Sequence, residues 1–335
     1  MMVLPDFRLE KPRTVDEALR ILAGEPRSRP VAGGTDLLVS MKQGLLGPAV
    51  LVDLKAVAGL DRLEVGEGGA VIGASVRLAR LRDDPGIAAR YPALALAAGR
   101  VAGPALQNMG TLGGNVCLDT RCWYYNQSLF WRRSRGFCLK KDGSVCHAAP
   151  GGRRCFAVFS ADTVPALIAL GARVRLARWA GGGRSERELP LGDLYVDDGI
   201  RRTVLEPGEI VVEVRLPGAE GVVSGFRKYR RRASIDYPLA NVAAALRLDG
   251  GRMRGVRIAV GALGPAPVLA RDAMEALEGE HPAPEVLARA AGLVTRGTRP
   301  VANQASTPPH RRRMARVLTR RLLEDLTGGG RGASM

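Results

Sequence analysis

Residues 29–44, RPVAGGTDLLVSMKQG, decide how the N-terminal part of this chain folds. The short run that ends at Val31 predicts a strand, the adjacent Gly33 and Gly34 predict a tight turn, and the apolar residues from Leu37 predict a helix. Because glycine has no Cβ atom, such a turn lets the backbone come close to a ligand. Its consecutive N–H groups, next to the start of a helix, are suited to binding an anion.

The sequence around this stretch completes a small α/β unit. Residues 15–24 carry apolar side chains at helical spacing, Thr14 is placed to cap that helix, and Glu17 completes a capping box. Residues 50–57 have the composition of a buried strand. We therefore expect an N-terminal subdomain at residues 1–55.

A second glycine turn, GTLGGN, occupies residues 110–115. Thr35 and Thr111 add hydroxyl groups to the two turns and Asn115 adds an amide, so the turns are suited to holding one pyrophosphate group from both sides. Neither turn is a Walker loop, and neither has the G-x-G-x-x-G fingerprint. Two ordinary turns in a glycine-rich chain are the alternative. The pattern predicts a phosphate-bearing ligand, such as a dinucleotide, held by two loops.

Length and composition indicate a folded protein of two or three domains. The chain has 335 residues, of which 46% are hydrophobic and 25% are charged. The sequence lacks an apolar run of the roughly 18–20 residues that a membrane span needs, and the N-terminus does not resemble a secretory signal. We therefore expect a cytoplasmic protein. A net charge of +17 suits nucleic acid, an acidic partner or an arginine-rich genome, and a solvated surface is the plainer alternative.

All five cysteines fall within residues 117–155: Cys117, Cys122, Cys138, Cys146 and Cys155. An odd count in a reducing compartment argues against a disulfide framework. Zinc sites use close cysteine pairs, whereas an iron–sulfur cluster accepts thiolates at wide spacings. The spacing favours a cluster held by the last four cysteines, although which four of the five bind stays open. His147 is an alternative ligand or hydrogen-bond donor, although a lone histidine is more often simply exposed.

The cysteines lie in a segment whose composition is that of an insertion. Residues 121–154 hold eight basic residues against one acid, Asp142, and six of the fifteen aromatic residues. Basic and aromatic residues together suit single-stranded nucleic acid or an acidic electron carrier. The arginine-rich segment 310–321 is a second candidate for nucleic acid. Because no nucleic-acid motif occurs elsewhere, we favour the redox interpretation.

The remaining pattern predicts an α+β protein. Helical segments are expected at 91–110, 284–294 and 310–326, and strands at 209–217 and 252–265. The expected plan has two α/β subdomains and a C-terminal α+β domain. Its boundaries are residues 1–55, residues 56–222 with a cysteine-rich insertion at about 118–158, residues 223–327, and a disordered tail at 328–335.

Five motifs taken together resemble a known family. They are AGGTD (32–36), IGASVRL (72–78), TLGGN (111–115), SADTVPALIALGA (160–172) and FRKYRRRASIDYPLANVAAAL (226–246). The chain resembles, over nearly its whole length, the FAD-binding medium subunit of the xanthine oxidase family of molybdenum hydroxylases. Ordinary medium subunits lack the insertion. With it, and with NVCLDTRCWYYNQ at 115–127, the chain resembles the β subunit of 4-hydroxybenzoyl-CoA reductase.

The resemblance implies FAD and a [4Fe-4S] cluster as cofactors. The implied FAD-binding residues are Val31, Ala32, Gly33, Gly34, Thr35, Asp36, Ala74, Ser75, Val101, Thr111, Gly113, Gly114, Asn115, Asp162, Val211 and Lys228. Among them, Asp162 and Lys228 match residues near the flavin ring, although Ser160 replaces the family's proline two residues before Asp162. The implied cluster ligands are Cys122, Cys138, Cys146 and Cys155.

The resemblance also implies a function without a catalytic residue in this chain. Electrons from ferredoxin would pass through the cluster and FAD to a [2Fe-2S] small subunit and a molybdopterin large subunit, which would reductively dehydroxylate 4-hydroxybenzoyl-CoA in anaerobic aromatic degradation. A dimer of heterotrimers is expected. The alternatives are a related molybdenum hydroxylase or dehydrogenase with outward electron flow, a standalone NAD(P)H-dependent flavoprotein reductase, and a basic nucleic-acid-binding protein.

Overall fold

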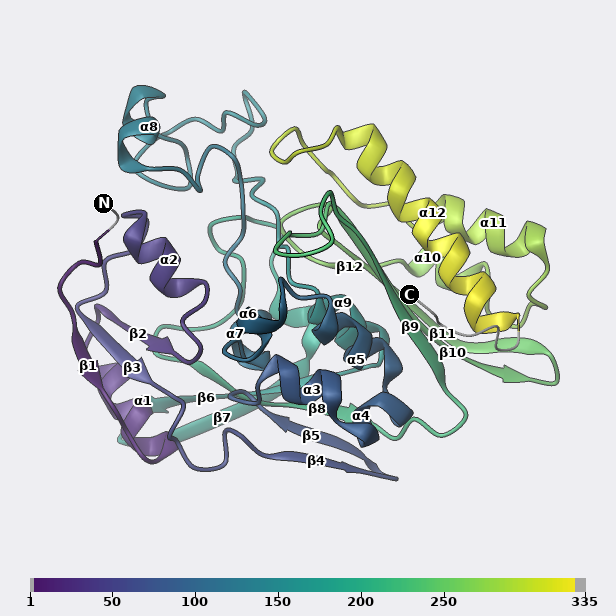
Figure 1. Cartoon of the computed structure of the whole chain (residues 1–335), viewed down its shortest axis with the longest axis horizontal. Helices are drawn as coiled ribbons and strands as arrows, with labels where there is room; N and C mark the ends of the chain where they lie inside the picture. The colour runs from purple at the N-terminus through teal and green to yellow at the C-terminus, as the bar shows by residue number, and fades with distance from the viewer. Residues whose placement is uncertain (1–2, 329–335) are drawn as a thin grey trace.

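The N-terminal part of the chain is a three-stranded parallel sheet with two helices (Figure 1). A computed structural model of the protein describes residues 3–328. The strands are β1 (Arg8–Glu10), β2 (Ser28–Val31) and β3 (Val50–Asp53), in the order β1-β3-β2, and the helices are α1 (Val15–Gly24) and α2 (Leu37–Lys42). The predicted helix and capping box are confirmed, because Thr14 and Glu17 each bond the backbone of the other. The predicted strand at 50–57 ends four residues early, at Asp53. The Leu54 amide still donates to Val31 O of β2, and the chain then enters a turn at Lys55.

The central part is built on a five-stranded antiparallel sheet. Its order is β4-β5-β8-β6-β7, with β4 at Leu63–Gly66, β5 at Gly69–Gly73, β6 at Arg173–Ala180, β7 at Gly183–Pro190 and β8 at Ile210–Pro217. Short helices connect β5 to the second glycine turn: α3 (Leu78–Asp83), α4 (Pro85–Arg90), α5 (Pro92–Gly99) and α6 (Pro104–Gln107). The helix α7 (Leu112–Val116) follows that turn, and the 3-10 helix η1 (Leu191–Leu194) follows β7.

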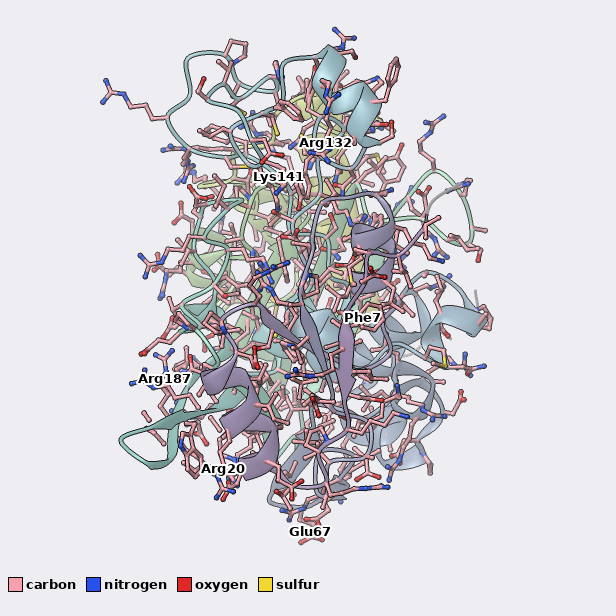
Figure 2. All side chains as sticks on the ribbon, turned by 90° about the vertical axis from the view of Figure 1, so that its left-hand side faces the viewer. Phe7, Arg20, Glu67, Arg132, Lys141 and Arg187 are labelled. Atoms are coloured by element: carbon pink, nitrogen blue, oxygen red, sulfur yellow. The ribbon has the colours of Figure 1, made fainter. Side chains whose placement is uncertain are left out.

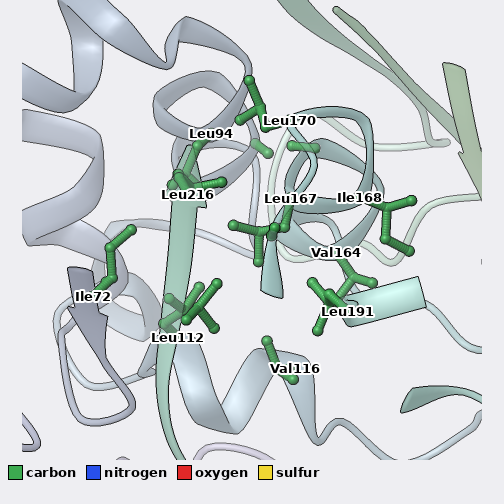
Figure 3. Packing of buried hydrophobic residues seen from close by; sticks show 14 of the residues in the cluster. Ile72, Leu94, Leu112, Val116, Val164, Leu167, Ile168, Leu170, Leu191 and Leu216 are labelled. Carbon is green, nitrogen blue, oxygen red and sulfur yellow. The ribbon is translucent and has the colours of Figure 1, made fainter. Parts of the chain in front are cut away.

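A buried helix joins the central part to the C-terminal part. Every residue of α9 (Thr163–Ala169) is buried. Figure 3 shows Val164 and Leu167 from this helix packed near Leu112 and Leu216, which come from α7 and β8. Because Leu112 and Val116 of α7 belong to this core, the second glycine turn is fixed relative to the central sheet, whereas Val31 and Met41 around the first turn pack in a separate small cluster.

The cysteine-rich insertion leaves this core between α7 and α9. Its two ends meet where Arg121 and Val158 exchange two backbone N–H···O bonds of 2.7 Å. The short helix α8 (Leu129–Ser134) lies at its far end, above α2 in Figure 1. Figure 2 shows Arg132 and Lys141 in the insertion, at the opposite end of the molecule from Glu67.

The C-terminal part is a four-stranded antiparallel sheet covered by helices (Figure 1). The strands are β9 (Val223–Tyr229), β10 (Ala240–Asp249), β11 (Arg252–Gly261) and β12 (Val268–Leu269), in the order β12-β11-β10-β9. The helices are α10 (Arg271–Glu275), α11 (Pro284–Leu293) and α12 (Pro308–Thr327). The predicted helices at 284–294 and 310–326 are confirmed within two residues. Apart from Gly328, the tail predicted to be disordered lies outside the described residues.

These three sheets confirm the predicted α+β class, with two N-terminal α/β subdomains and a C-terminal α+β domain. Among the helices of residues 3–328, none combines the length and the apolar character that crossing a bilayer requires.

Candidate cofactor sites

The first glycine turn opens onto a cavity of about 320 Å³ between the N-terminal and central parts. The predicted site residues that line it are Val31, Ala32, Gly33, Gly34, Thr35, Asp36, Val101, Thr111, Gly114, Asn115 and Asp162. The structure therefore brings both glycine turns and Asp162 to one place, as a ligand held by two loops requires.

A second cavity of about 820 Å³ lies on the other side of the turns. It is lined by the predicted residues Ala74, Ser75, Gly113 and Val211, and it shares Ala32, Thr111 and Gly114 with the first cavity. The two cavities therefore adjoin at the glycine turns, which contribute residues to both linings. An elongated ligand with a phosphate group at its middle fits this arrangement.

The first turn offers unused backbone donors. Within residues 3–328, the N–H groups of residues 32–36 donate to no backbone or side-chain oxygen. Gly33 packs so closely on the next loop that a Cβ atom would lie 1.9 Å from the carbonyl oxygen of Met109, and Gly34 has φ +67°. These glycines are required by the shape of the turn, and the free N–H groups are the donors that an anion needs.

The second turn uses its backbone amides within the fold. Gly113 donates to Ala74 O over 2.8 Å, and Gly114 donates to Thr111 Oγ1 over 3.2 Å. Asn115 Oδ1 accepts from the amide and the hydroxyl of Thr163, at 3.2 and 2.6 Å. The groups that remain for a ligand are the O–H of Thr111 and the Nδ2 amino group of Asn115.

A buried ion pair closes one end of the first cavity. Lys228 Nζ lies 2.6 Å from Asp162 Oδ2, and Asn241 Nδ2 donates to Asp162 Oδ1 over 3.1 Å. Lys228 also donates to Arg100 O over 2.9 Å, and both charged side chains are almost fully buried. Burial raises the pKa of Asp162 and lowers that of Lys228, and each charge opposes the effect on the other. Asp162 lines the cavity. Lys228 does not line it, and would affect a ligand there only through its ion pair with Asp162.

The insertion gathers four of the five cysteines around a small cavity of about 20 Å³. Cys122, Cys138, Cys146 and Cys155 all line it, and the last three are buried. Cys117 instead lines the two larger cavities. The structure therefore brings together the four predicted ligands and separates the fifth cysteine from them.

The geometry of these thiols bears on which metal group they could hold. Within the described residues, no three His, Cys, Asp or Glu side chains are grouped closely enough to hold one metal ion. A four-iron cluster places its core between four thiolates and so needs them further apart. Burial raises the pKa of Cys122 to about 12 and that of Cys155 to about 11. Binding a metal would therefore release protons from these sites.

His147 also lines the cysteine cavity, but its Nε2 faces the carbonyl oxygen of Phe137. Its ring lies 5.4 Å from that of Tyr124. The contact with a carbonyl oxygen favours the predicted role as a hydrogen-bond donor over the role as a metal ligand.

Comparison with known proteins agrees with this geometry. Residues 5–219 match the family described as the FAD binding domain in molybdopterin dehydrogenase, and residues 224–326 match the CO dehydrogenase flavoprotein C-terminal domain. The chain belongs to the FAD-binding medium subunits of the molybdenum hydroxylase family. It is an oxidoreductase subunit that binds FAD.

Individual relatives support the assignment over most of the chain. The aldehyde oxidoreductase FAD-binding subunit PaoB of Escherichia coli is 34% identical over 270 residues, which cover 78% of this chain and 82% of the relative. The carbon monoxide dehydrogenase medium chain of Afipia carboxidovorans is 27% identical, with coverage of 96% and 97%. The crystal structure of quinoline 2-oxidoreductase from Pseudomonas putida 86 matches with a TM-score of 0.78 at 28% identity, covering 98% of this chain and 99% of that one.

The site of this medium subunit fits FAD. The free amides of the first turn suit the pyrophosphate, and the cavities on either side of the turns accommodate the two ends of the dinucleotide. When bound, FAD supplies the exchange of one or two electrons. Because the chain belongs to a family of oxidoreductase subunits, the redox interpretation is favoured over the nucleic-acid alternative, which rested on the basic and aromatic residues of 121–154 and on segment 310–321.

Sequence reasoning missed several residues of the medium subunit's cavities. Tyr237 and Arg202 line the first cavity, and Arg121 stacks on the Tyr237 ring 4.6 Å from its centroid while pairing with Asp36. Asp119 lines the same cavity and pairs with Lys140 of the insertion. These contacts join residues that are far apart in sequence, so no local sequence pattern predicts them.

Proposed function

We propose that this medium subunit carries a [4Fe-4S] cluster in addition to FAD and belongs to an enzyme of the 4-hydroxybenzoyl-CoA reductase type. The observation that carries the proposal is the convergence of Cys122, Cys138, Cys146 and Cys155 on one cavity inside the insertion. Buried thiols in a reducing compartment have little reason to gather unless a metal group holds them.

In this proposal, reduced ferredoxin supplies electrons singly at the insertion. A small subunit with [2Fe-2S] clusters and a large subunit with molybdopterin receive them, and the large subunit removes the phenolic hydroxyl of 4-hydroxybenzoyl-CoA. The residues of this chain hold and separate the two electron carriers and touch no organic substrate. We propose the dimer of heterotrimers and the cytoplasmic location on the same basis.

The surface of the insertion supports an acidic electron donor. Arg133, Arg135 and Arg153 are exposed on it, and Phe130 is 84% exposed and Trp123 is 53% exposed. A basic surface with exposed aromatic rings suits transient docking of a small acidic protein. We expect the ferredoxin-dependent rate to fall as salt rises, because salt screens such charges. A rate independent of salt would contradict this donor.

Outward electron flow is the second candidate function. It is favoured by the names of the relatives, which include carbon monoxide dehydrogenase and glyceraldehyde dehydrogenase. In that case the complex would oxidise its substrate and reduce the acceptor that docks on this subunit. Assay of the complex in both directions, with reduced ferredoxin or with an oxidised acceptor, distinguishes the two.

Cofactor analysis of the anaerobically purified complex tests the proposal. We expect about one FAD, four iron and four acid-labile sulfide atoms in this subunit. Cys138→Ser should lose the iron and keep the flavin, whereas Cys117→Ser, as the matched control outside the cysteine cavity, should keep the iron. A subunit that contains FAD and zinc, or FAD without iron, would overturn the cluster and leave the family assignment standing.

A further inference from the structure

A thin layer of side chains separates the cysteine cavity from the flavin cavity. Lys140 lines the cysteine cavity and Asp119 lines the flavin cavity. The two side chains form an ion pair, with Lys140 Nζ 2.8 Å from Asp119 Oδ1. The pair therefore spans the layer, with its positive end toward the thiols and its negative end toward the flavin.

Lys140 is held rigidly in this position. Besides Asp119, its Nζ donates to Gly199 O over 2.9 Å and to Thr120 O over 3.1 Å, and it contacts the Thr120 hydroxyl. Its side chain is only 6% exposed. A lysine on the surface of an insertion normally extends into solvent, so this burial needs a reason.

Tyr125 completes the layer. Its ring centroid lies 4.5 Å from Lys140 Nζ, and its hydroxyl donates to Asp119 Oδ2 over 3.4 Å. Tyr125 also lines the cysteine cavity. On the flavin side, Arg202 Nη1 lies 3.6 Å from Asp119 Oδ1. Arg202 thus offsets part of the negative charge of Asp119. Among the described residues that line the cysteine cavity, none is an aspartate or glutamate, and Lys140 is the only lysine or arginine.

We propose that Lys140 is fixed beside the cysteine cavity to raise the reduction potential of the cluster bound there. This inference rests on the proposed [4Fe-4S] cluster. One-electron reduction adds one negative charge to the cluster and breaks no bond. A buried ammonium group stabilises that charge more strongly than an exposed one because little water screens it.

Redox titration of the anaerobic complex with dithionite, followed by EPR of the reduced cluster, tests the role of Lys140. We expect Lys140→Met to retain its iron and FAD and to shift the cluster to lower potential. At the wild-type midpoint potential, the ratio of reduced to oxidised cluster should fall by about tenfold or more. The matched control is Lys141→Met, because Lys141 is the next residue, is 37% exposed and pairs with Asp142.

A variant that removes both charges of the pair controls for an effect of the unpaired Asp119 on folding. Lys140→Met leaves Asp119 without its main partner, so the double variant Asp119→Asn with Lys140→Met removes both charges, and its potential should lie between those of the wild type and Lys140→Met. An unchanged potential in iron-replete Lys140→Met would overturn the inference and leave the cluster standing. If both Lys140 variants lost their iron, Lys140 would be a folding residue and the inference would fail. Wild-type protein without iron would overturn the proposed function itself.

Discussion

Asp162, which lines the first cavity, forms with Lys228 an ion pair in which both side chains are almost fully buried. Removing one partner of a buried ion pair leaves the charge of the other partner buried and unpaired. This lowers the free energy of unfolding by more than the intact pair contributes to it. A surface pair of the same type contributes little, because water screens both charges. The two situations occur on neighbouring residues here, since Arg227 pairs with Asp325 on the surface of β9 and α12.

Asp162→Asn should therefore weaken both the fold and the flavin site. We expect the free energy of unfolding to fall by about 3–5 kcal/mol and the purified protein to contain less FAD. Asp325→Asn is the control and should change stability by less than about 1 kcal/mol. Chemical denaturation with a parallel measurement of flavin absorbance checks both variants. Equal stability of the two would show that the buried pair has no special role.

Arg121, which pairs with Val158 where the two ends of the insertion meet (the neck of the insertion), links the insertion to the flavin site. It pairs with Asp36 of the first glycine turn and stacks on Tyr237. Arg121→Gln should raise the dissociation constant for FAD by about tenfold, as expected for one charged hydrogen bond in a partly buried site. Fluorescence titration of the deflavinated protein measures this. Arg133→Gln, on the exposed surface of α8, should leave the affinity unchanged. Equal dissociation constants for FAD in the two variants would show that Arg121 does not contribute to flavin binding.

At the scale of elements, the first glycine turn requires Gly33. A methyl group there would overlap the backbone of Met109, so Gly33→Ala must displace one of the two loops. We expect loss of FAD from the purified protein. Gly24→Ala is the control, because Gly24 ends α1 with nothing within 4 Å of the added atom. Retention of FAD by Gly33→Ala would show that the two loops can move apart without cost to the site.

The helix α12 is attached to the C-terminal sheet through a buried arginine. Arg311 donates to the backbone oxygens of Leu239 and Val301, over 3.1 and 3.2 Å, and contacts that of Ala262. Burial lowers the pKa of Arg311 to about 10. Arg311→Met removes the guanidinium donor from the carbonyl groups of Leu239 and Ala262, while Val301 O keeps its bond from the Asn303 amide, and should lower the free energy of unfolding by about 3–5 kcal/mol.

Thermal or urea unfolding measures this change. Arg320→Met, on the exposed face of α12 where Arg320 pairs with Glu324, should change stability by less than about 0.5 kcal/mol. If the two variants unfolded alike, the buried contacts of Arg311 would be of no consequence for stability.

The elements that local sequence determines are the ones that sequence analysis predicts well. Thr14 and Glu17 set the start of α1, and the glycines set the turn before α2, because each acts on residues three or four positions away. The gathering of the cysteines is predictable from their confinement to one segment. The order of the central sheet, with β8 between β5 and β6, is not predictable in this way, because it depends on packing across more than a hundred residues. The same holds for the pairing of Lys140 with Asp119, which only the folded insertion brings together.

At the scale of the whole molecule, the central sheet carries arginine–carboxylate pairs that depend on pH. Arg187 bonds both oxygens of Glu209 at 2.7 Å, and Arg175 and Arg215 bond Glu213. Burial is the largest single influence and would raise the pKa of Glu209 and Glu213, but the hydrogen bonds and the positive charges of the arginines together outweigh it and lower both values. A lowered pKa gives stability that is present above the unfolded pKa of about 4.5 and is lost as pH falls through the folded value.

We therefore expect the free energy of unfolding to fall as pH is lowered from about 5 toward 3. Glu213→Gln should be less stable at neutral pH and should lose less stability on acidification than the wild type. Glu220→Gln, an exposed carboxyl, should follow the wild-type curve. Urea unfolding across this pH range is the measurement. Parallel curves for Glu213→Gln and the wild type would contradict the role of the pair.

The neck at Arg121 and Val158 bears on how such a subunit arises in evolution. Because Arg121 and Val158 exchange two backbone hydrogen bonds, the two ends of the intervening segment lie side by side. Gaining or losing it changes the entropy of closing a surface loop only modestly. A gene encoding a flavin subunit without the segment can therefore acquire it, together with the cluster proposed above, in a single event. Subunits with and without the segment are then expected to be interchangeable by recombination at these two residues.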